Sequence, residues 1–404
     1  MTTESVAGRS TSARRGWVAP LCWVTIALEG FDLVVLGVVI PSLLKEPSWG
    51  LDPGTAALIA TVGLVGVMVG ALVVGPVTDL VGRRRAMIGT VVVFSILTLA
   101  CAFAQDPWTF GALRFLAGIG LGGVLPVALA MVNETAPRGR AGSATTTMMT
   151  GYHAGAVLSS LLGIVVISSL GLGWRPMFVI GGLIAVLLLP ALVLRLPESE
   201  VFAQQGGKGT GNPVAVLFRP GYRRATLAFW LASIMGLLLV YGLNTWLPQI
   251  MIAAGYRLGA SLALLLTLNV GAVIGLLVAG QVANRIGTRT AALVWFVLAA
   301  VFLALLTVRL PGVAIYGTVL LAGIFTFSSQ VLVYAYVGQR YPDAARATAL
   351  GASSGVGRIG AIAGPLVTAP LLAAGVAFPW GFFLFAAVAA VGAAGVAAAG
   401  RTTA

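Results

Sequence analysis

The stretch G-P-V-T-D-L-V-G-R-R-R, which runs from Gly75 to Arg85, says most about the fold of this chain. A second stretch, G-Q-V-A-N-R-I-G-T-R-T, begins at Gly280. Each lies between two apolar runs, so each predicts a short turn between two helices. The matching positions have identical spacing: Gly75, Asp79, Gly82 and Arg84 correspond to Gly280, Asn284, Gly287 and Arg289. The chain is therefore expected to consist of two repeated halves.

The composition of the chain is that of a membrane protein. Of its 404 residues, 59% are hydrophobic and 9% are charged, whereas about 25% are charged in an ordinary soluble domain. A membrane helix needs about 20 mostly apolar residues. Twelve such runs are present, near 18–41, 56–75, 86–104, 109–133, 142–168, 174–196, 224–247, 260–283, 288–308, 312–338, 346–374 and 377–399. We predict an all-α membrane protein with twelve transmembrane helices, multi-pass in the cytoplasmic (inner) membrane.

The duplication and one long polar, Gly-rich interruption after Pro197 predict the domain organisation. Two pseudo-symmetric six-helix bundles are expected, and the interruption is expected to link them. The predicted segments are a cytoplasmic N-terminal tail (1–16), an N-terminal bundle (17–196), a cytoplasmic linker (197–223), a C-terminal bundle (224–400) and a short tail (401–404).

The basic residues predict the orientation in the membrane. Most of the 24 Lys and Arg residues lie in the two terminal segments and in every second loop. Cytoplasmic loops carry the excess of Lys and Arg, so both termini are expected in the cytoplasm. This topology also accounts for the net charge of +13 without any binding to nucleic acid.

The Gly75 stretch resembles the signature of the major facilitator superfamily, G-x-x-x-D-x-x-G-R-R. Its place between the second and third helices, with an echo between the eighth and ninth, fits that family. Further segments resemble its aromatic acid:proton symporters: E-G-F-D from Glu29, R-F-L-A-G-I-G-L-G-G from Arg114, P-E-S from Pro197, Y-G-L-N-T-W-L-P from Tyr241 and G-V-G-R-I-G-A-I-A-G-P from Gly355. The resemblance implies proton-coupled uptake of aromatic carboxylates such as benzoates and hydroxybenzoates. The chain departs from the family pattern in Glu29, where Asp is typical, and in His153.

Two acids in the first helix are candidates for proton coupling. Glu29 and Asp32 lie three residues apart and hence on one helical face. Ionisable groups inside a membrane span are costly and usually functional. A proton symporter needs a carboxylic acid that gains and loses a proton within the working pH range. The alternative is that Asp32 forms a fixed ion pair with Arg114 or Arg358.

Arg358 is the candidate for binding a substrate carboxylate. It lies within the eleventh predicted helix, and a guanidinium stays charged and can hold a carboxylate through two parallel hydrogen bonds. The alternative is a structural counter-ion for Asp32. Both roles can alternate, because protonation of Asp32 would free Arg358 for the substrate.

His153 and Arg114 are further candidates for substrate binding. His153 follows Pro137 by the same sixteen residues that separate Arg358 from Pro342, which places the two at similar depth in related helices. The alternative for His153 is a packed, hydrogen-bonded side chain. Arg114, in the fourth helix, is expected to attract anions, to pair with Asp32 or to snorkel to the membrane interface.

Other polar and aromatic residues are suited to an aromatic substrate, which needs flat apolar walls and a few polar groups. Ordinary packing or a place in the interfacial belt is the alternative for the aromatic ones. The candidates are Tyr241, Asn244, Trp246, Asn269, Gln330 and Tyr334.

The loop after the second helix is a candidate gate. Arg83 or Arg84 could pair with Asp79 or Glu134, and such pairs would hold the halves closed on the inner face and break when it opens. Asn284 replaces the acid in the second copy, so a weaker latch is expected there. The alternative is a charge cluster that only sets topology, since exposed pairs are weak. The gating set comprises Gly75, Asp79, Gly82, Arg83, Arg84, Glu134 and Arg140.

The sequence carries no pattern of an enzyme. It has no metal-ligand cluster, no phosphate-binding G-x-x-x-x-G-K-[ST] and no Ser/His/Asp set. We therefore expect no metal or cofactor and a proton as the coupling ion, with a small organic anion and the lipid bilayer as partners and a monomer as the working form.

The competing hypothesis is a proton-driven exporter of drugs or metabolites. Exporters of the superfamily often carry G-P-x-x-G-G in the fifth helix, where this chain has G-Y-H-A-G-A from Gly151.

Overall fold

The computed structural model describes residues 16–135, 141–198, 216–341 and 343–400. Within them, 12 helices are long and apolar enough to cross a membrane, which confirms the predicted all-α architecture. The helices are α2 (Val18–Leu43), α3 (Pro53–Val81), α4 (Arg83–Cys101), α5 (Pro107–Thr135), α6 (Ala141–Gly163, continued by the π-helix η1, Ile164–Ser169), α7 (Arg175–Arg195), α10 (Arg223–Ala253), α11 (Leu258–Ile286), α12 (Thr288–Leu305), α13 (Gly312–Arg340), α14 (Asp343–Ala373) and α15 (Ala377–Ala398).

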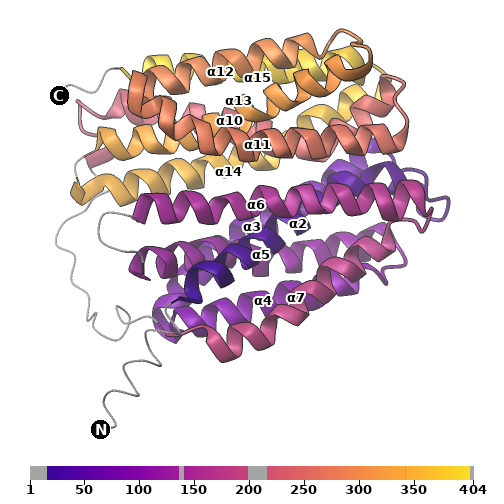
Figure 1. Ribbon diagram of the computed structural model, residues 1–404, viewed down its shortest axis with the longest axis horizontal. Helices are drawn as coiled ribbons and strands as arrows, with labels where there is room; N and C mark the ends of the chain where they lie inside the picture. The colour runs from indigo at the N-terminus through magenta and orange to yellow at the C-terminus, as the bar shows by residue number, and fades with distance from the viewer. Residues whose placement is uncertain (1–15, 136–140, 199–215, 342, 401–404) are drawn as a thin grey trace. The chain divides into compact units, whose positions relative to one another are not determined.

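The described residues form two compact units. Unit 1 lies within Met1–Leu51 and Val62–Gly207, and unit 2 lies within Asp52–Thr61 and Lys208–Ala404. In each unit the helices run side by side along roughly one direction (Figure 1). The exact bounds of the predicted bundles and linker, and the cytoplasmic placement of the termini, stay predictions.

Glycine brings helices of unit 1 close together. A Cβ on Gly30 of α2 would run into the backbone carbonyl of Tyr152 in α6, and one on Gly155 of α6 would run into that of Ala27. Small residues of this kind let membrane helices approach closely and gain dispersion energy, because lipid offers little hydrophobic drive for association. The α2–α6 contact therefore holds Glu29, Asp32 and His153 on adjacent helices.

Unit 2 uses the same device between α10 and α14. A Cβ on Gly360 of α14 would meet the carbonyl of Ile234 in α10, and one on Gly364 would lie 2.8 Å from the backbone nitrogen of Gly242. The first and fifth helices of each unit thus pack through glycine, as expected for a duplicated chain. This contact places Tyr241 and Arg358 on neighbouring helices.

The duplicated motif folds the same way in both units. Gly82 has φ 95° and Gly287 has φ 85°, and each is the residue before a helix that begins after a sharp turn. Side chains with a Cβ rarely adopt such angles. In unit 1, Nη2 of Arg84 donates to the carbonyl of Val193, at 2.6 Å. In unit 2, Nη2 of Arg289 donates to the carbonyl of Ala397, at 3.2 Å.

These two arginines satisfy carbonyls in the last turns of α7 and α15. Carbonyls at a helix C-terminus lack partners within the helix and carry partial negative charge, so a guanidinium stabilises them. The arginine of the motif therefore joins the start of the third helix of each unit to the end of the sixth.

Several predicted helix boundaries differ from the structure. The second predicted helix ends at 75, whereas α3 continues to Val81. The seventh predicted helix ends at 247, whereas α10 continues past Pro248 to Ala253. A proline removes one backbone donor, and membrane helices tolerate this because local adjustments satisfy the freed carbonyl. The fifth predicted helix ends at 168, but its last turn, Ile164–Ser169, is π-helical.

Candidate functional site

A buried ion pair joins Asp32 of α2 to Arg114 of α5 within unit 1. Nη1 of Arg114 donates to Oδ2 of Asp32 at 2.6 Å, and Nη2 donates to the backbone carbonyl of Asp32 at 3.0 Å. The side chain of Asp32 is 2% exposed and that of Arg114 is 3% exposed. The structure therefore contains the Asp32–Arg114 ion pair that is the alternative to proton coupling by Asp32, and the burial of Arg114 speaks against snorkelling. The roles of Asp32 in proton coupling and of Arg114 in substrate binding stay predictions.

Two further groups complete the surroundings of this pair. The hydroxyl of Thr98 in α4 donates to Oδ1 of Asp32 at 2.7 Å, and the ring of Phe178 in α7 lies 5.9 Å from the Arg114 guanidinium carbon. Both carboxylate oxygens of Asp32 thus accept a hydrogen bond, which is the condition for burying a charge at tolerable cost. Because the charges compensate each other, adding or removing one proton changes the net charge of this site.

Glu29 and His153 are also buried in unit 1. Glu29 is 3% exposed and His153 is 7% exposed. The ring of His153 lies edge-on to that of Tyr152, with 5.1 Å between centroids. Each has interactions of its own in the structure, so the packed alternative for His153 fits its surroundings. Their roles in proton coupling and substrate binding stay predictions.

Arg358 of α14 meets Tyr241 of α10 in unit 2. Nη1 of Arg358 donates to the Tyr241 hydroxyl at 3.1 Å, and the contact is partly buried. This hydrogen bond orients the guanidinium and leaves the tyrosine hydroxyl able to donate. Two predicted site residues are thereby brought together on adjacent helices.

The two predicted asparagines form a second polar contact in unit 2. Nδ2 of Asn269 in α11 donates to Oδ1 of Asn244 in α10 at 2.9 Å, and both side chains are buried. Trp246 is fully buried, and its indole N–H donates to the carbonyl of Pro365 at 2.8 Å. This environment favours the packing alternative for Trp246 and a structural bond for the asparagine pair.

Gln330 and Tyr334 lie one turn apart on α13. Gln330 is 4% exposed. The hydroxyl of Tyr334 lies within hydrogen-bonding reach of Ser354 in α14, and Arg358 and Tyr241 are close enough to act on it electrostatically. Four predicted substrate-binding residues of unit 2 (Tyr241, Gln330, Tyr334 and Arg358) therefore gather where α10, α13 and α14 meet.

Two residues of the predicted gating set, Arg83 and Glu134, form an ion pair in the structure. Nε of Arg83 lies 3.5 Å from Oε1 of Glu134, and both side chains are largely buried. The pair links α4 to α5 within unit 1. Arg84 points instead to the end of α7, as described above. Arg140 lies outside the described residues, and the surroundings of Gly75 and of the Asp79 side chain are not described either, so the gating roles of these residues stay predictions.

Glu198 is a residue to which the sequence analysis assigned no role. Its Oε1 accepts the backbone N–H of Arg84 at 3.0 Å, next to the N-terminus of α4. A carboxylate there satisfies a donor that the helix leaves free and complements the helix dipole. The P-E-S segment after α7 draws attention to Glu198 in the sequence. Glu198 and Arg84 are 114 positions apart, however, so no local pattern predicts their contact.

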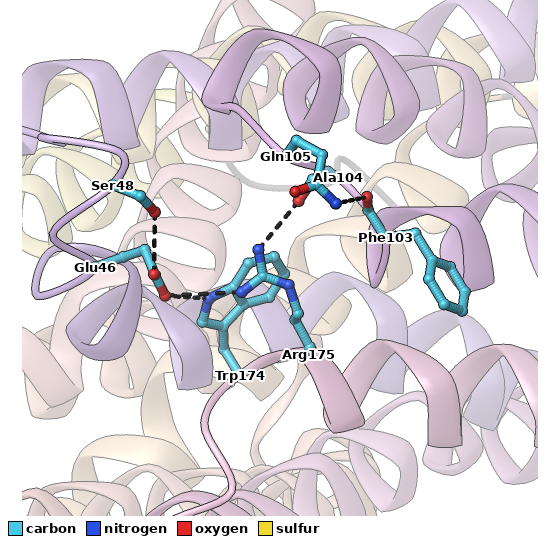
Figure 2. Close-up of polar contacts among 7 residues, drawn as sticks. All are labelled: Glu46, Ser48, Phe103, Ala104, Gln105, Trp174 and Arg175. Atoms are coloured by element: carbon cyan, nitrogen blue, oxygen red, sulfur yellow. Dashed lines mark hydrogen bonds and ion pairs between the residues drawn. The ribbon is translucent and has the colours of Figure 1, made fainter.

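A polar cluster lies at the opposite ends of the unit 1 helices, among Glu46, Ala104, Trp174 and Arg175. Figure 2 shows the Arg175 guanidinium between the Glu46 carboxylate and the Ala104 carbonyl. Nη1 of Arg175 lies 3.8 Å from Oε2 of Glu46, and Nη2 donates to Ala104 at 3.2 Å. Oε2 of Glu46 also accepts the indole N–H of Trp174 at 3.2 Å. The loops that follow α2, α4 and η1 are thus tied together.

Aromatic rings continue from this cluster toward the Asp32–Arg114 pair. Trp174 and Phe110 meet edge-on with 5.5 Å between centroids, and Phe110 meets Phe178 with 5.3 Å. Phe178 in turn lies beneath Arg114. Edge-to-face ring pairs pack rigidly, so the position of the Arg114 guanidinium is set by a packed column of rings.

Two acids outside the membrane spans cap helices. Asp52 precedes α3, and Asp106 precedes α5. A hydrogen bond from the Thr55 hydroxyl lowers the pKa of Asp52, helped by the Thr55 backbone N–H. The Thr109 hydroxyl and backbone N–H lower the pKa of Asp106 in the same way. Both are exposed structural caps and differ in this from the buried Asp32.

A search of the described residues for three or more His, Cys, Asp or Glu side chains able to hold a metal found none.

The sequence matches the Major Facilitator Superfamily over residues 22–365. Curated relatives include a gentisate transporter of Corynebacterium glutamicum, 37% identical over 93% of this chain and 85% of that protein. A benzoate transport protein of Acinetobacter baylyi is 34% identical over 87% and 82%, and a 3-(3-hydroxy-phenyl)propionate transporter of Escherichia coli is 35% identical over 91% and 89%.

Among solved structures, a D-xylose-proton symporter is similar in fold, with a TM-score of 0.78 over 94% of this chain and 96% of that one. Only 16% of the aligned residues are identical, so this likeness concerns the fold alone. The twelve-helix architecture expected from the sequence is therefore confirmed twice, by the helices and by this neighbour.

Proposed function

We propose that this chain, which belongs to the Major Facilitator Superfamily, is a proton-coupled importer of an aromatic carboxylate that works by alternating access. The family and the curated relatives are transporters. The chain is accordingly a multi-pass membrane transporter and not an enzyme. The substrate, the coupling ion and the direction of transport are the proposed parts.

The substrate class is supported by the relatives. Gentisate, benzoate and 3-(3-hydroxyphenyl)propionate each combine an aromatic ring with a carboxylate, and the proteins named for them match most of this chain. The shared requirement is a cation for the carboxylate and flat surroundings for the ring. Unit 2 offers both near Arg358.

Arg358 is the proposed partner of the substrate carboxylate. Its guanidinium is held by the Tyr241 hydroxyl, which fixes its orientation before the substrate arrives. Preorganisation lowers the entropic cost of binding. A guanidinium can hold the two oxygens of a carboxylate through paired hydrogen bonds. The Tyr241 hydroxyl, which accepts from Arg358, can donate its own hydrogen to the same anion.

The observation that carries the proton-coupling part is the buried Asp32–Arg114 pair. With Asp32 ionised, the two charges compensate each other. Protonation would remove the negative charge and weaken the 2.6 Å contact with Arg114. Since the side chains lie on α2 and α5 and contact Thr98 of α4 and Phe178 of α7, one proton can alter the packing of four helices. Such a two-state element is what coupling requires.

The remaining parts of the proposal follow from the sequence. Glu29 and His153, buried near Asp32, are proposed to assist proton transfer, and no cofactor takes part. The Arg83–Glu134 pair is proposed to break and re-form as unit 1 changes conformation. Both termini are proposed to lie in the cytoplasm, with the monomer as the working form.

The test is a substrate screen followed by transport. The purified protein is heated with benzoate, the hydroxybenzoates, gentisate, muconate and non-aromatic acids, and the shift in unfolding temperature is recorded. Uptake of the acids that stabilise it is then measured in proteoliposomes, with and without a proton uncoupler. We expect aromatic carboxylates to stabilise and to accumulate only with a proton gradient. Stabilisation by non-aromatic acids alone, or accumulation that survives the uncoupler, would overturn the proposal.

A further inference from the structure

Gln330 of α13 has hydrogen-bonding capacity that the protein does not use. Its side chain is 4% exposed, and among the described residues neither Nε2 nor Oε1 has a partner in hydrogen-bond geometry. Buried amides are almost always satisfied, because an unmet donor or acceptor is costly. The exception calls for a ligand or a water molecule that meets this amide during function.

Gly236 of α10 makes room for this amide. A Cβ at position 236 would collide with Oε1 of Gln330 and lie 3.1 Å from its Cδ. Only glycine at this position lets the amide stand against α10 without displacement. Both helices are therefore shaped around this amide, whose polar neighbour Tyr334 lies on the same helix without meeting hydrogen-bond geometry.

The amide belongs to the same cluster as Arg358. Tyr334 is the next residue along the same face of α13, and it lies close to Gln330, Ser354 and Arg358. The guanidinium and the amide thus both act on the Tyr334 hydroxyl. A flat ligand whose carboxylate meets Arg358 would extend along Tyr334 toward Gln330.

We propose that Gln330 binds a ring hydroxyl of the substrate, so that the transporter selects hydroxylated aromatic carboxylates over unsubstituted benzoate. This rests on the proposed function above. A phenolic hydroxyl both donates and accepts, and the amide has an acceptor and two donors, so one hydroxyl can meet either atom. An unsubstituted ring edge would leave the amide buried without a partner.

The expected selectivity is large enough to measure. A site built to hydrogen-bond a hydroxyl rejects the analogue that lacks it much more strongly than an apolar pocket rejects a missing methylene. A water molecule can compensate in part. We therefore expect the best hydroxybenzoate or dihydroxybenzoate to bind about tenfold or more tightly than benzoate.

The experiment compares dissociation constants of the purified full-length protein for benzoate, the three monohydroxybenzoates and gentisate. Gln330→Met keeps the length and volume of the side chain and removes the amide. We expect this variant to bind benzoate at least as well as the wild type and to lose the preference for hydroxylated acids. The matched control is Gln281→Met in α11, where an exposed amide bonds to the carbonyl of Leu277; its preference should be unchanged.

A second variant tests the inference even if Gln330→Met does not fold. Gly236→Ala leaves the amide in the chain but pushes it from its position, and it should reduce the preference in the same direction. Equal affinity of the wild type for benzoate and hydroxybenzoates would overturn the inference, as would an intact preference in the folded variants. Failure of every aromatic carboxylate to bind the wild type is a different result, because it would overturn the proposed function itself.

Discussion

Arg114 donates to Asp32 across 2.6 Å inside unit 1, and hardly any of either side chain is exposed. The two residues are 82 positions apart in the sequence and lie on α2 and α5, so the contact depends on the fold. A charge pair this deeply buried contributes little net stability compared with an apolar pair, yet breaking it is costly. Removing one partner of this pair is therefore expected to cost more stability than replacing both.

Asp32→Asn should abolish proton-driven accumulation of the substrate. The amide cannot take up or release a proton in the working range, so uphill uptake should vanish, whereas exchange of labelled for unlabelled substrate should continue. Proteoliposome uptake under an imposed pH gradient measures the first, and counterflow measures the second. Asp106→Asn, which changes an exposed helix cap, is the matched control and should accumulate substrate normally. Undiminished accumulation by Asp32→Asn would remove Asp32 from the coupling step.

The stability of this variant is a separate prediction. Asp32→Asn leaves Arg114 buried without its counter-charge, which should cost about 3–5 kcal/mol. Adding Arg114→Gln removes the uncompensated charge and should recover part of this loss. Thermal unfolding of the detergent-solubilised single and double variants measures the difference. A double variant no more stable than the single one would show that the Arg114 charge is not what destabilises Asp32→Asn.

Arg358→Lys should weaken binding of the carboxylate substrate about tenfold or more, because an ammonium cannot form the paired hydrogen bonds of a guanidinium. Tyr241→Phe removes the hydroxyl that holds Arg358 and should weaken binding less. Isothermal titration of both variants gives the two values. Affinity unchanged by Arg358→Lys would make Arg358 a structural residue.

Glu134→Gln should slow turnover with little change in substrate affinity. The pair with Arg83 joins α4 to α5 within unit 1 and includes none of the proposed carboxylate-binding residues, so its loss should alter the rate of the conformational change. Initial uptake rates over a range of substrate concentrations separate the two effects. A raised KM with an unchanged maximal rate would argue against gating.

Gly82→Ala and Gly287→Ala should each destabilise the protein by about 1–3 kcal/mol, since the backbone angles at both positions are almost restricted to glycine. Gly280→Ala is the control, because a Cβ there meets open space on a helix and alanine favours helix. Unfolding temperatures of the three variants test this. Equal temperatures for all three would mean that the two turns relax without strain.

The pH dependence of stability should reveal the helix cap at Asp106. Its pKa lies below the ordinary value of 3.8 because the folded protein hydrogen-bonds the ionised form. The stabilisation is therefore fully present above pH 3.8 and is lost as the pH falls through the lowered pKa. Asp106→Ala should unfold at a lower temperature than the wild type at pH 7, and this gap should close as the pH falls through the lowered pKa of Asp106. A gap that persists at low pH would exclude the carboxylate as its cause.

The fold could be predicted from the sequence because a bilayer imposes one rule on every span. Each helix must be apolar for about 20 residues, and this signal is local. The duplicated motif further predicted that the two halves are related by a repeat. The motif does adopt the same structure in both units, at Gly82 and Arg84 in the first and at Gly287 and Arg289 in the second. The exact ends of the helices were predicted less accurately, because a membrane helix can continue past a proline, as α10 does at Pro248.

The candidate site could be predicted only in outline. The rarity of charges in membrane spans singled out Asp32, Arg114 and Arg358, but the choice of partner depends on packing between helices far apart in the chain. Thr98 was missed because most hydroxyls in membrane helices bond to their own backbone. The Glu46–Arg175 contact was missed for the same reason as Glu198: its 129-residue separation leaves no local pattern.

The most direct test of the central claim, that substrate moves inward together with protons, is to record both fluxes in the same proteoliposomes. The lumen holds a pH-sensitive dye, and gentisate or a hydroxybenzoate is added outside with no pH gradient imposed. We expect the lumen to acidify as the acid enters, beyond any acidification in protein-free liposomes, and we expect Asp32→Asn to abolish this acidification. Entry of substrate with no proton movement, or with alkalinisation of the lumen, would contradict it.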